Sequence, residues 1–505
     1  MGITNSLSLK AAAFVAVSVM TLPVLAAGSD VTIVLDVQPD QVDACQASKS
    51  QVGKVIKQNV TETLTEIDPA SGKVLPRLAT EWSQTDPQTW RLKLRENVKF
   101  HDGTPFNGEA LKVAFARLLN EKLDCEIRVK YFGGLTVDVG VLGEHEVEIK
   151  TNKPIPILPT LLSTVTVPAP STPHDEYSRQ PIGTGPYTFA DWQAGKNIVL
   201  KRFDEYWGEK PAVTSATYVW RQESTVRAAM VASGEADIAF NIAVQDAIDP
   251  RTDFSYLNAE TTRLRIDVPI APLDDIRVRQ ALNYAIDRDA LQGTIFSEDV
   301  IPATQLVVPG TNGHNPDLKP YVYDLDKAKE LLKQAEAAGV PVKKEILLVG
   351  RHNFFPNSEE AVQALQAMYS AAGLNVKLQM TESSEWYDAL FKPFAESRGP
   401  NLFLDQHDNT SGDASLTIYA KYHSNGGQSV LNDKELDDLI DRANVATGEE
   451  RTKLYQQAFK RIHEELVGDV ALFHMVGFTR VNGRLEFKPT LATNGELQLA
   501  QIKIR

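Results

Sequence analysis

Apolar runs and helix-like segments alternate along residues 345–405, and this alternation constrains the fold more than any other feature of the chain. The spacing of apolar residues predicts strands at 345–349, 374–380 and 401–404, and helices at 359–373 and 383–392. Strands separated by helices are expected to be parallel neighbours in one sheet, joined by right-handed crossovers. The sequence therefore predicts an α/β fold class.

Polar and charged residues follow each of these expected strands, with Thr381 and Glu382 after the second. In open α/β sheets, ligands bind beyond the carboxyl ends of the strands. The candidate ligand-binding residues at these ends are Arg351, His352 and Asn353 after the first strand, and Asp405, His407, Asp408 and Asn409 after the third. For any one of them, a solvated loop residue is the alternative. Together they predict a binding site at one edge of the sheet.

Arg351 is a candidate contact for an anionic group of the ligand, because a guanidinium binds a carboxylate or a phosphate through two parallel hydrogen bonds. Trp386 is a candidate stacking surface in the same region, with a plain core position as the alternative. We also count Cys45 and Gln46, near the start of the chain, among the candidate ligand-binding residues.

The length and the charge of the chain exclude several classes of protein. At 505 residues, the chain is long enough for roughly two to four domains. Its formal net charge of −14 disfavours binding to nucleic acid or to an anionic membrane surface. No apolar stretch after the first residues reaches the roughly 20 residues of a membrane-spanning helix, so we expect no direct membrane insertion.

Residues 1–27 have the pattern of a secretory signal peptide. Lys10 precedes a short apolar run, and small residues follow at Ala26 and Ala27, near which we expect cleavage. A membrane anchor is the alternative, but the run is short for a span and Pro23 interrupts it. The mature protein is therefore expected to be periplasmic.

Export allows a disulfide between the only two cysteines, Cys45 and Cys125. By the chain-entropy model, a bridge that closes such a long loop stabilises the fold by about 4 kcal/mol. Two buried thiols are the alternative, because the sequence does not give the distance between them. Two cysteines cannot form a four-cysteine zinc site.

Motifs for catalysis are incomplete in this sequence. His463-Glu464 begins like a zincin motif, but Val467 stands where the second histidine is required. The sequence has no Gly-x-Ser-x-Gly elbow and no phosphate-binding Gly-Lys-Thr loop. We therefore expect a protein that is not an enzyme, with no cofactor and no metal site. An exported hydrolase that uses Asp405 and Asp408 and a chaperone-like interaction protein are the alternatives from other classes.

A series of motifs runs in order along nearly the whole mature chain. They are LPRLATEW at 75–82, FHDGTPF at 100–106, GTGPY at 183–187, SGEAD at 233–237 and DIRVRQALNYAIDR at 275–288. With these motifs the chain resembles the bacterial extracellular solute-binding proteins of family 5, which are dipeptide- and oligopeptide-binding receptors of ABC importers.

The resemblance implies a two-lobed periplasmic-binding-protein clamshell, type II-like, with an extra α/β subdomain on the first lobe. Lobe I would comprise residues 28–70, 183–265 and 478–505, the extra subdomain residues 71–182, and lobe II residues 266–477. It further implies a monomer that captures its ligand by hinge closure and delivers it to the permease subunits of an ABC importer.

The resemblance also bears on the ligand. Peptide-binding members have a Trp-x-x-Asp-x-x-Asp-Pro segment whose first acid pairs with the free amino group of the peptide. This chain has LFLDQHDN at 402–409, so the first acid maps to Asp405, but Leu402 replaces the tryptophan and Asn409 the proline. An alternative alignment runs through Asp408 and Asp413. A peptide or peptide-like ligand is expected, with an opine, a sugar phosphate or another hydroxylated anionic solute as the alternative.

Overall fold

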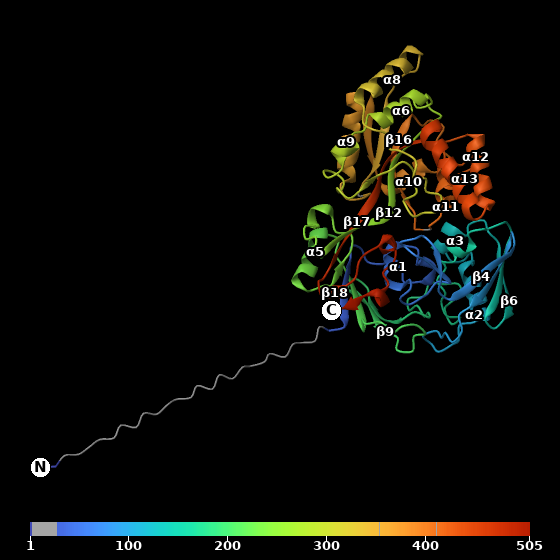
Figure 1. The fold of residues 1–505 in the computed structure, drawn as a ribbon, viewed down its shortest axis with the longest axis vertical. Coiled ribbons are helices and arrows are strands. Elements are labelled where there is room, and N and C mark those ends of the chain that lie inside the picture. The colour runs from blue at the N-terminus through green and yellow to red at the C-terminus, as the bar shows by residue number, and fades with distance from the viewer. Residues whose placement is uncertain (3–27, 353, 411) are drawn as a thin grey trace.

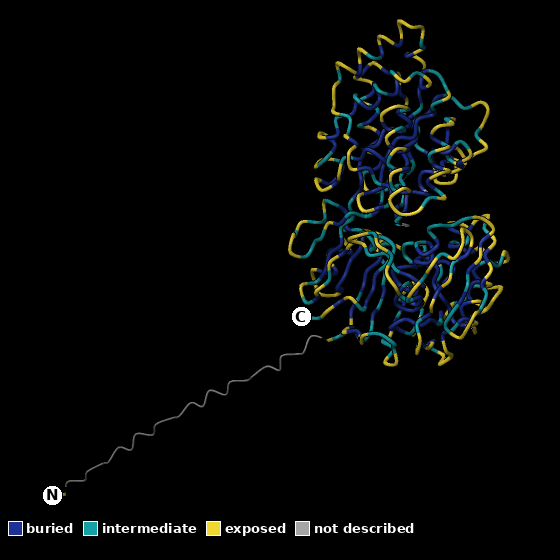
Figure 2. Tube along the Cα trace, turned by 45° about the vertical axis from the view of Figure 1, so that its right-hand side comes forward, coloured by how far each residue is buried: buried dark blue, intermediate teal, exposed yellow. Residues whose placement is uncertain are grey.

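Two lobes joined by two long strands make up the chain (Figure 1). The computed structural model describes residues 1–2, 28–352, 354–410 and 412–505. Residues 3–27, which make up most of the predicted signal peptide, lie outside the described residues. Asn353 lies outside them as well. Each lobe has a buried interior of its own, visible as separate dark regions in Figure 2. The fold is therefore a two-lobed α/β clamshell.

The strands β12 (Asp253–Ile266) and β17 (Asp469–Val481) run antiparallel and pass from one lobe into the other. They form the centre of one sheet with the order β15-β14-β16-β12-β17-β11-β1-β10-β9-β8. Their ladder is interrupted between Leu257 and Thr261, where Ala259 adopts a positive φ of 65°. A bulge of this kind bends a strand and breaks the regular pairing. The interruption lies at the level of the cleft between the lobes, since Asn258 and Glu260 line cavities there.

The lower lobe in Figure 1 is built around the strand β1. β1 (Asp30–Leu35) pairs in parallel with β10 (Ser215–Trp220) and β11 (Ile238–Ala239). β9 (Asn197–Arg202) and β8 (Tyr187–Gln193) extend this side of the sheet. Its helices include α1 (Ser50–Ile56) and α5 (Ser224–Ser233).

A separate four-stranded antiparallel sheet belongs to the same lobe, within the range predicted for the extra subdomain. Its order is β4-β5-β7-β6, with β4 at Ala79–Asp86, β5 at Thr89–Leu94, β6 at Val137–Gly143 and β7 at Glu146–Thr151. The helix α2 (Gly108–Leu118) packs beside β6, and the short helix α3 (Glu126–Tyr131) lies at the edge that faces the upper lobe (Figure 1).

The upper lobe contains the three strands predicted between residues 345 and 405. β14 (Ile346–Arg351) pairs in parallel with β15 (Val376–Thr381) and with β16 (Asn401–Asp408), which confirms the predicted parallel arrangement. The crossover helices are α9 (Ser358–Ala372) and α10 (Ser383–Leu390). β16 is longer than its predicted four residues, because residues 402–408 pair antiparallel with β12.

Further helices complete the upper lobe, within residues 266–477. α6 (Ile276–Tyr284) and α8 (Leu325–Ala337) pack against each other. α11 (Ala414–Tyr422), α12 (Lys434–Val445) and α13 (Gly448–Lys460) form a small helical layer with its own apolar cluster. The exact lobe boundaries assigned from sequence stay a prediction.

Candidate functional site

Two cavities in the cleft share one residue, Asp408. The aromatic chamber, about 330 Å³ in volume, is lined by Lys130, Arg351, Phe354, Trp386, Tyr387, Asp405, Gln406, His407, Asp408, Ala420, Lys421 and Gln428. The polar chamber, about 210 Å³, is lined mainly by the lower lobe, with Ala47, Ser48, Ser50, Lys57, Glu66, Tyr131, Glu260, Asp408, Thr410 and residues 487–498 among its walls. A groove of about 990 Å³ adjoins the aromatic chamber at Phe354. The aromatic chamber reaches the lower end of the size range of small-ligand pockets, which begins at roughly 300 Å³.

Arg351, at the end of β14, is the cation of the aromatic chamber that has no acidic partner. No carboxylate among the described residues forms an ion pair with it, and its buried Nε has no hydrogen-bond partner. Its guanidinium carbon lies 3.9 Å from the ring centroid of Phe354 and 5.1 Å from that of Trp386. Aromatic faces hold a guanidinium in place without neutralising its charge. Arg351 is therefore positioned to bind an anionic group of a ligand.

Asp405 is already neutralised inside the upper lobe. Its Oδ2 accepts hydrogen bonds from Lys421 Nζ at 2.6 Å and from Arg263 Nε at 3.1 Å, and the residue is 1% exposed. Burial alone raises the pKa of Asp405, but Lys421 and Arg263 outweigh it and hold the pKa below its ordinary value. The carboxylate of Asp405 therefore already has two cationic partners in the upper lobe, and its contact with a ligand stays a prediction.

Asp408, at the end of β16, lies where the two chambers meet. Its Oδ2 accepts a hydrogen bond from Lys130 Nζ at 3.1 Å, and Lys130 belongs to α3 of the lower lobe. The backbone N–H and the hydroxyl of Thr410 donate to the same carboxylate. Burial opposes the ionisation of Asp408, but Lys130 lowers its pKa below the ordinary value. A charged contact therefore crosses the cleft at this residue.

The remaining candidate residues at the ends of β16 and β14 are His407, Asn409 and His352. Each of them has a hydrogen-bond partner within the protein. His407 shares a hydrogen bond with the hydroxyl of Thr417, and burial lowers its pKa to about 3, so its imidazole is neutral. Asn409 is buried and donates to the carbonyls of Ala259 and Leu306, so its amide N–H groups hold the chain in place. His352 is half-exposed beside Glu359, which raises its pKa.

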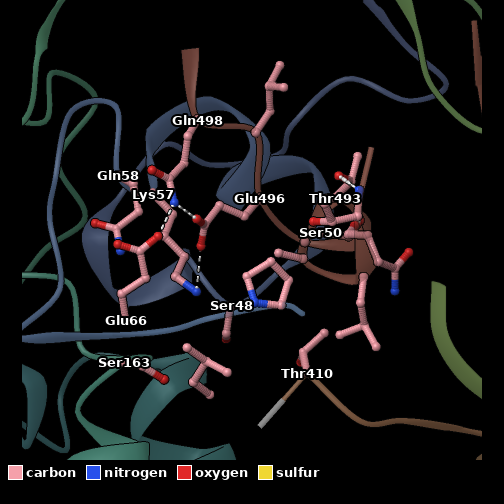
Figure 3. A pocket seen from close by; sticks show the side chains of 18 of the residues that line it. Ser48, Ser50, Lys57, Gln58, Glu66, Ser163, Thr410, Thr493, Glu496 and Gln498 are labelled. Atoms are coloured by element: carbon pink, nitrogen blue, oxygen red, sulfur yellow. Dashed lines mark hydrogen bonds and ion pairs between the residues drawn. The ribbon is translucent and has the colours of Figure 1, made fainter. Parts of the chain in front are cut away.

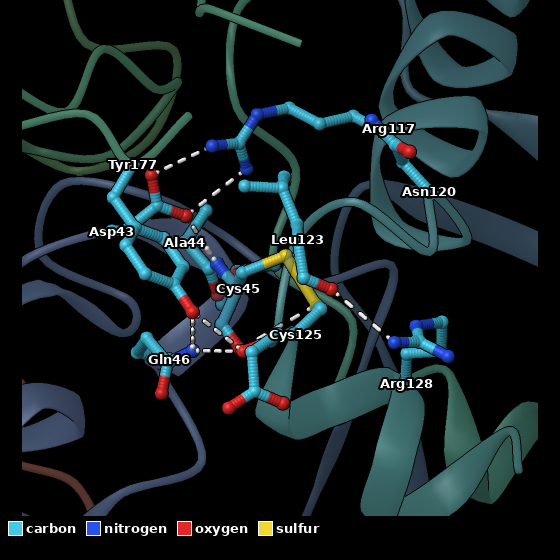
Figure 4. Close-up of a disulfide and its surroundings, with 12 residues drawn as sticks. Asp43, Ala44, Cys45, Gln46, Arg117, Asn120, Leu123, Cys125, Arg128 and Tyr177 are labelled. Atoms are coloured by element: carbon cyan, nitrogen blue, oxygen red, sulfur yellow. Dashed lines mark hydrogen bonds and ion pairs between the residues drawn. A yellow bond between two sulfur atoms is a disulfide. The ribbon is translucent and has the colours of Figure 1, made fainter. Parts of the chain in front are cut away.

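Cys45 and Gln46 lie in the interior of the lower lobe, which corrects their assignment to the ligand-binding surface (Figure 4). Cys45 forms a disulfide with Cys125, with the two Cα atoms 4.8 Å apart. The amide of Gln46 donates to the carbonyl of Asp124 at 2.6 Å. The residues that immediately follow, Ala47 and Ser48, line the polar chamber instead.

The polar chamber contains a carboxyl group beside Asp408 (Figure 3 shows residues that line this chamber). Glu260 on β12 is the cross-strand partner of Asp408, and its Oε1 accepts a long hydrogen bond of 3.4 Å from Asn494. Burial and the neighbouring Asp408 raise the pKa of Glu260 to about 8. Lys57 and Glu496, which also line this chamber, form an ion pair at 2.9 Å.

Among the cleft residues that sequence reasoning missed are Lys130, Glu260, Tyr387 and Lys421. Lys130 lies 278 residues before its partner Asp408, and no local pattern connects them. Glu260 could be identified only from the structure, because its position beside Asp408 results from the pairing of β12 with β16. Tyr387 follows the predicted Trp386 directly, so the position of Trp386 on its helix was the one available signal.

Comparison with known proteins places this fold in one family. The model for bacterial extracellular solute-binding proteins, family 5 Middle, matches residues 73–429. The chain belongs to the bacterial extracellular solute-binding proteins of family 5. The chain is 28% identical over 440 residues to the nickel-binding periplasmic protein of Escherichia coli K12, which covers 79% of this chain and 80% of the relative. It is 27% identical over 440 residues to the dipeptide-binding protein of the same organism, covering 80% and 81%.

The fold also agrees with a solved structure. The PBP AgaA in complex with agropinic acid, from A. tumefaciens R10, superposes with a TM-score of 0.74 at 23% identity, covering 94% of this chain and 99% of that one. The family consists of binding proteins rather than enzymes, and the nickel-binding relative is a periplasmic protein. Across the part of the chain that the structure describes, we find no helix with the length and apolar character needed to cross a bilayer.

Proposed function

We propose that this protein is the solute-binding receptor of an ABC importer and that it captures a small peptide or peptide-like solute in the aromatic chamber. The observation that carries this proposal is the separation of charge in the cleft. Arg351 offers an uncompensated cation at one end, and Asp408 with Glu260 offers acidic groups at the other. A zwitterion with a carboxylate and an ammonium group matches both ends, because buried charges are stable only when paired.

A hydroxylated anionic solute, such as an opine or a sugar phosphate, is the second candidate. One observation favours it: Lys130 lines the same chamber as Arg351, so two cations face the same space. A solute with two anionic groups would contact both, provided that Lys130 turned away from Asp408. The structure with agropinic acid is similar to this chain in fold.

The proposal includes an exported, periplasmic monomer that binds without chemical turnover and transfers its solute to permease subunits. A hydrolase would need Asp405 and Asp408 as an acid–base pair. Asp405 instead has Lys421 and Arg263 as permanent partners, so its carboxylate is not available to take up a proton from water. The same pairing makes Asp408 the better candidate for an ammonium group.

A thermal-shift series tests the proposal. The purified wild-type protein is heated with dipeptides, free amino acids, opines and sugar phosphates in separate samples. The same series is run with an Arg351→Ala variant. We expect stabilisation by at least one zwitterionic solute, weakened on the order of 10- to 100-fold in affinity by R351A, because a hydrogen-bonded charge pair is lost. Arg351→Lys is the matched control that keeps the charge. Stabilisation that R351A leaves unchanged would contradict the proposed site.

A further inference from the structure

The segment that carries Lys130 depends on the disulfide for its position. Cys125 is the residue that precedes α3, and Lys130 and Tyr131 are the last two residues of that six-residue helix. Cys45 lies in a short helical turn, Ala44–Gln46, and Ala47 and Ser48 follow it into the wall of the polar chamber. The Cys45–Cys125 bond thus joins two parts of the lower lobe that both face the cleft (Figure 4).

The Cys45 side of this bond is firmly anchored. Asp43 is buried, its Oδ1 accepts from the backbone N–H of Cys45 at 2.8 Å, and its carboxylate receives hydrogen bonds of 3.0 and 2.7 Å from Arg117. The backbone N–H of Ser178 donates to the same carboxylate at 2.6 Å. Thr166 also donates to the carbonyl of Ala44. This turn therefore has a buried ion pair and several hydrogen bonds that fix it in the lobe.

The α3 side is held mainly by apolar packing and backbone hydrogen bonds. A helix of six residues is unstable on its own, and the side chain of Cys125 makes no capping hydrogen bond. Its anchors are Ile127 and Tyr131, both buried in the core of the lower lobe, and the carbonyl of Asp124, which accepts from Gln46 at 2.6 Å and from Tyr177 at 2.7 Å. The disulfide is the covalent connection between this short helix and the turn at Cys45.

The contact made by Lys130 is sensitive to the position of the helix. Its Nζ reaches 3.1 Å from Asp408 Oδ2 in the upper lobe, and the two side chains are 36% and 29% exposed. A hydrogen bond of this length is lost when the donor moves by about an ångström. We propose that the Cys45–Cys125 disulfide positions Lys130 for its contact with Asp408 and thereby controls how tightly the cleft closes.

This inference deepens the proposed function, on which its consequence for ligand affinity rests, but the contact itself is testable without a ligand. The amine of Lys130 should react slowly with an acetylating reagent such as sulfo-NHS acetate while it is paired with Asp408. Mass spectrometry gives the acetylation rate of each lysine in the full-length folded protein. Lys434, which is exposed on α12, is the internal control.

We expect the variant C45A/C125A to raise the acetylation rate of Lys130 about three- to ten-fold, with the rate of Lys434 unchanged. Asp408→Asn should raise it by a similar factor, and adding D408N to C45A/C125A should give less than a two-fold further increase. Gln46→Ala removes a hydrogen bond to the same loop but leaves the disulfide, so its Lys130 should react within two-fold of the wild-type rate.

Three results would overturn the inference. They are a Lys130 rate in folded C45A/C125A within two-fold of wild type, a rate that D408N does not change, or a Q46A variant that reacts as fast as C45A/C125A. Should C45A/C125A fail to fold, wild-type protein partly reduced under native conditions replaces it, with the Lys130 rate compared between the oxidised and reduced fractions. If no solute in the thermal-shift series stabilises the protein, the proposed function is refuted. The acetylation rates of Lys130 would be unaffected by that result.

Discussion

Lys130 and Asp408 meet across the cleft, with Nζ of the lower-lobe lysine 3.1 Å from Oδ2 of the upper-lobe aspartate. The contact occupies the boundary between the two chambers, and Arg351 lies in the wall of one of them. A solute with an ammonium group must compete with Lys130 for Asp408, whereas a solute with two anionic groups would gain Lys130 as a partner. Whether the ion pair between Lys130 and Asp408 breaks when a solute binds therefore depends on the charges of that solute.

Lys130→Met separates these two possibilities. For a zwitterionic solute we expect affinity to rise a few-fold, because a partly exposed ion pair contributes at most about 1 kcal/mol and the variant removes the competitor. For a solute with two anionic groups we expect affinity to fall by about ten-fold. Isothermal titration calorimetry with each class of solute decides, and Lys130→Arg is the control that keeps the charge.

Asp405→Asn should damage stability far more than binding. The variant leaves Arg263 and Lys421 buried without their shared carboxylate, which we expect to lower the free energy of unfolding by about 3–5 kcal/mol. Urea unfolding measures the change. Asp438→Asn, which breaks an exposed pair with Lys434, should change it by less than about 0.5 kcal/mol. A D405N protein of normal stability that no longer binds solute would restore Asp405 as a ligand contact.

The sequence was sufficient to predict the part of the site that one sheet brings together. The alternation between residues 345 and 405 predicted β14, β15 and β16 as parallel neighbours, and from that arrangement Arg351, Asp405 and Asp408 were expected at one edge. They line one chamber. This worked because the connections between those strands are local, so a short stretch of sequence contains both the strands and their crossovers.

The sequence could not predict which cations neutralise Asp405 and Asp408, because those cations come from distant segments of the chain. Asp405 is neutralised from β12 and α11, and Asp408 receives Lys130 from the other lobe. No periodicity indicates which strand lies next to β16. Gln46 was assigned to the cleft, whereas its amide holds a loop beside the disulfide.

Glu260 should make stability depend on pH. Its pKa is raised to about 8 in the folded protein from 4.5, so the folded state binds more protons than the unfolded state between these values. Its contribution is therefore fully present below about pH 4.5 and is lost as the pH rises toward 8. Relative to wild type, Glu260→Gln should raise the free energy of unfolding by about 1–3 kcal/mol at pH 8.5 and by almost nothing at pH 4.5.

Urea unfolding at several pH values measures this difference, with Glu336→Gln on the exposed face of α8 as the control. The control should follow the wild-type pH dependence throughout. An E260Q protein whose unfolding free energy parallels that of wild type between pH 4.5 and 8.5 would show that Glu260 is ionised in the cleft, and the acidic end would then carry two negative charges.

Native mass spectrometry of the protein, purified without denaturant, tests the central claim most directly. The wild-type protein should carry excess masses that fragment into amino acids or peptide-like units, and R351A should carry none, because its cleft lacks the cation for the carboxylate. Asp438→Asn, prepared in parallel, should retain the wild-type pattern. A phosphate- or sugar-containing adduct, or a peptide retained equally by R351A, would contradict a zwitterionic solute held by Arg351.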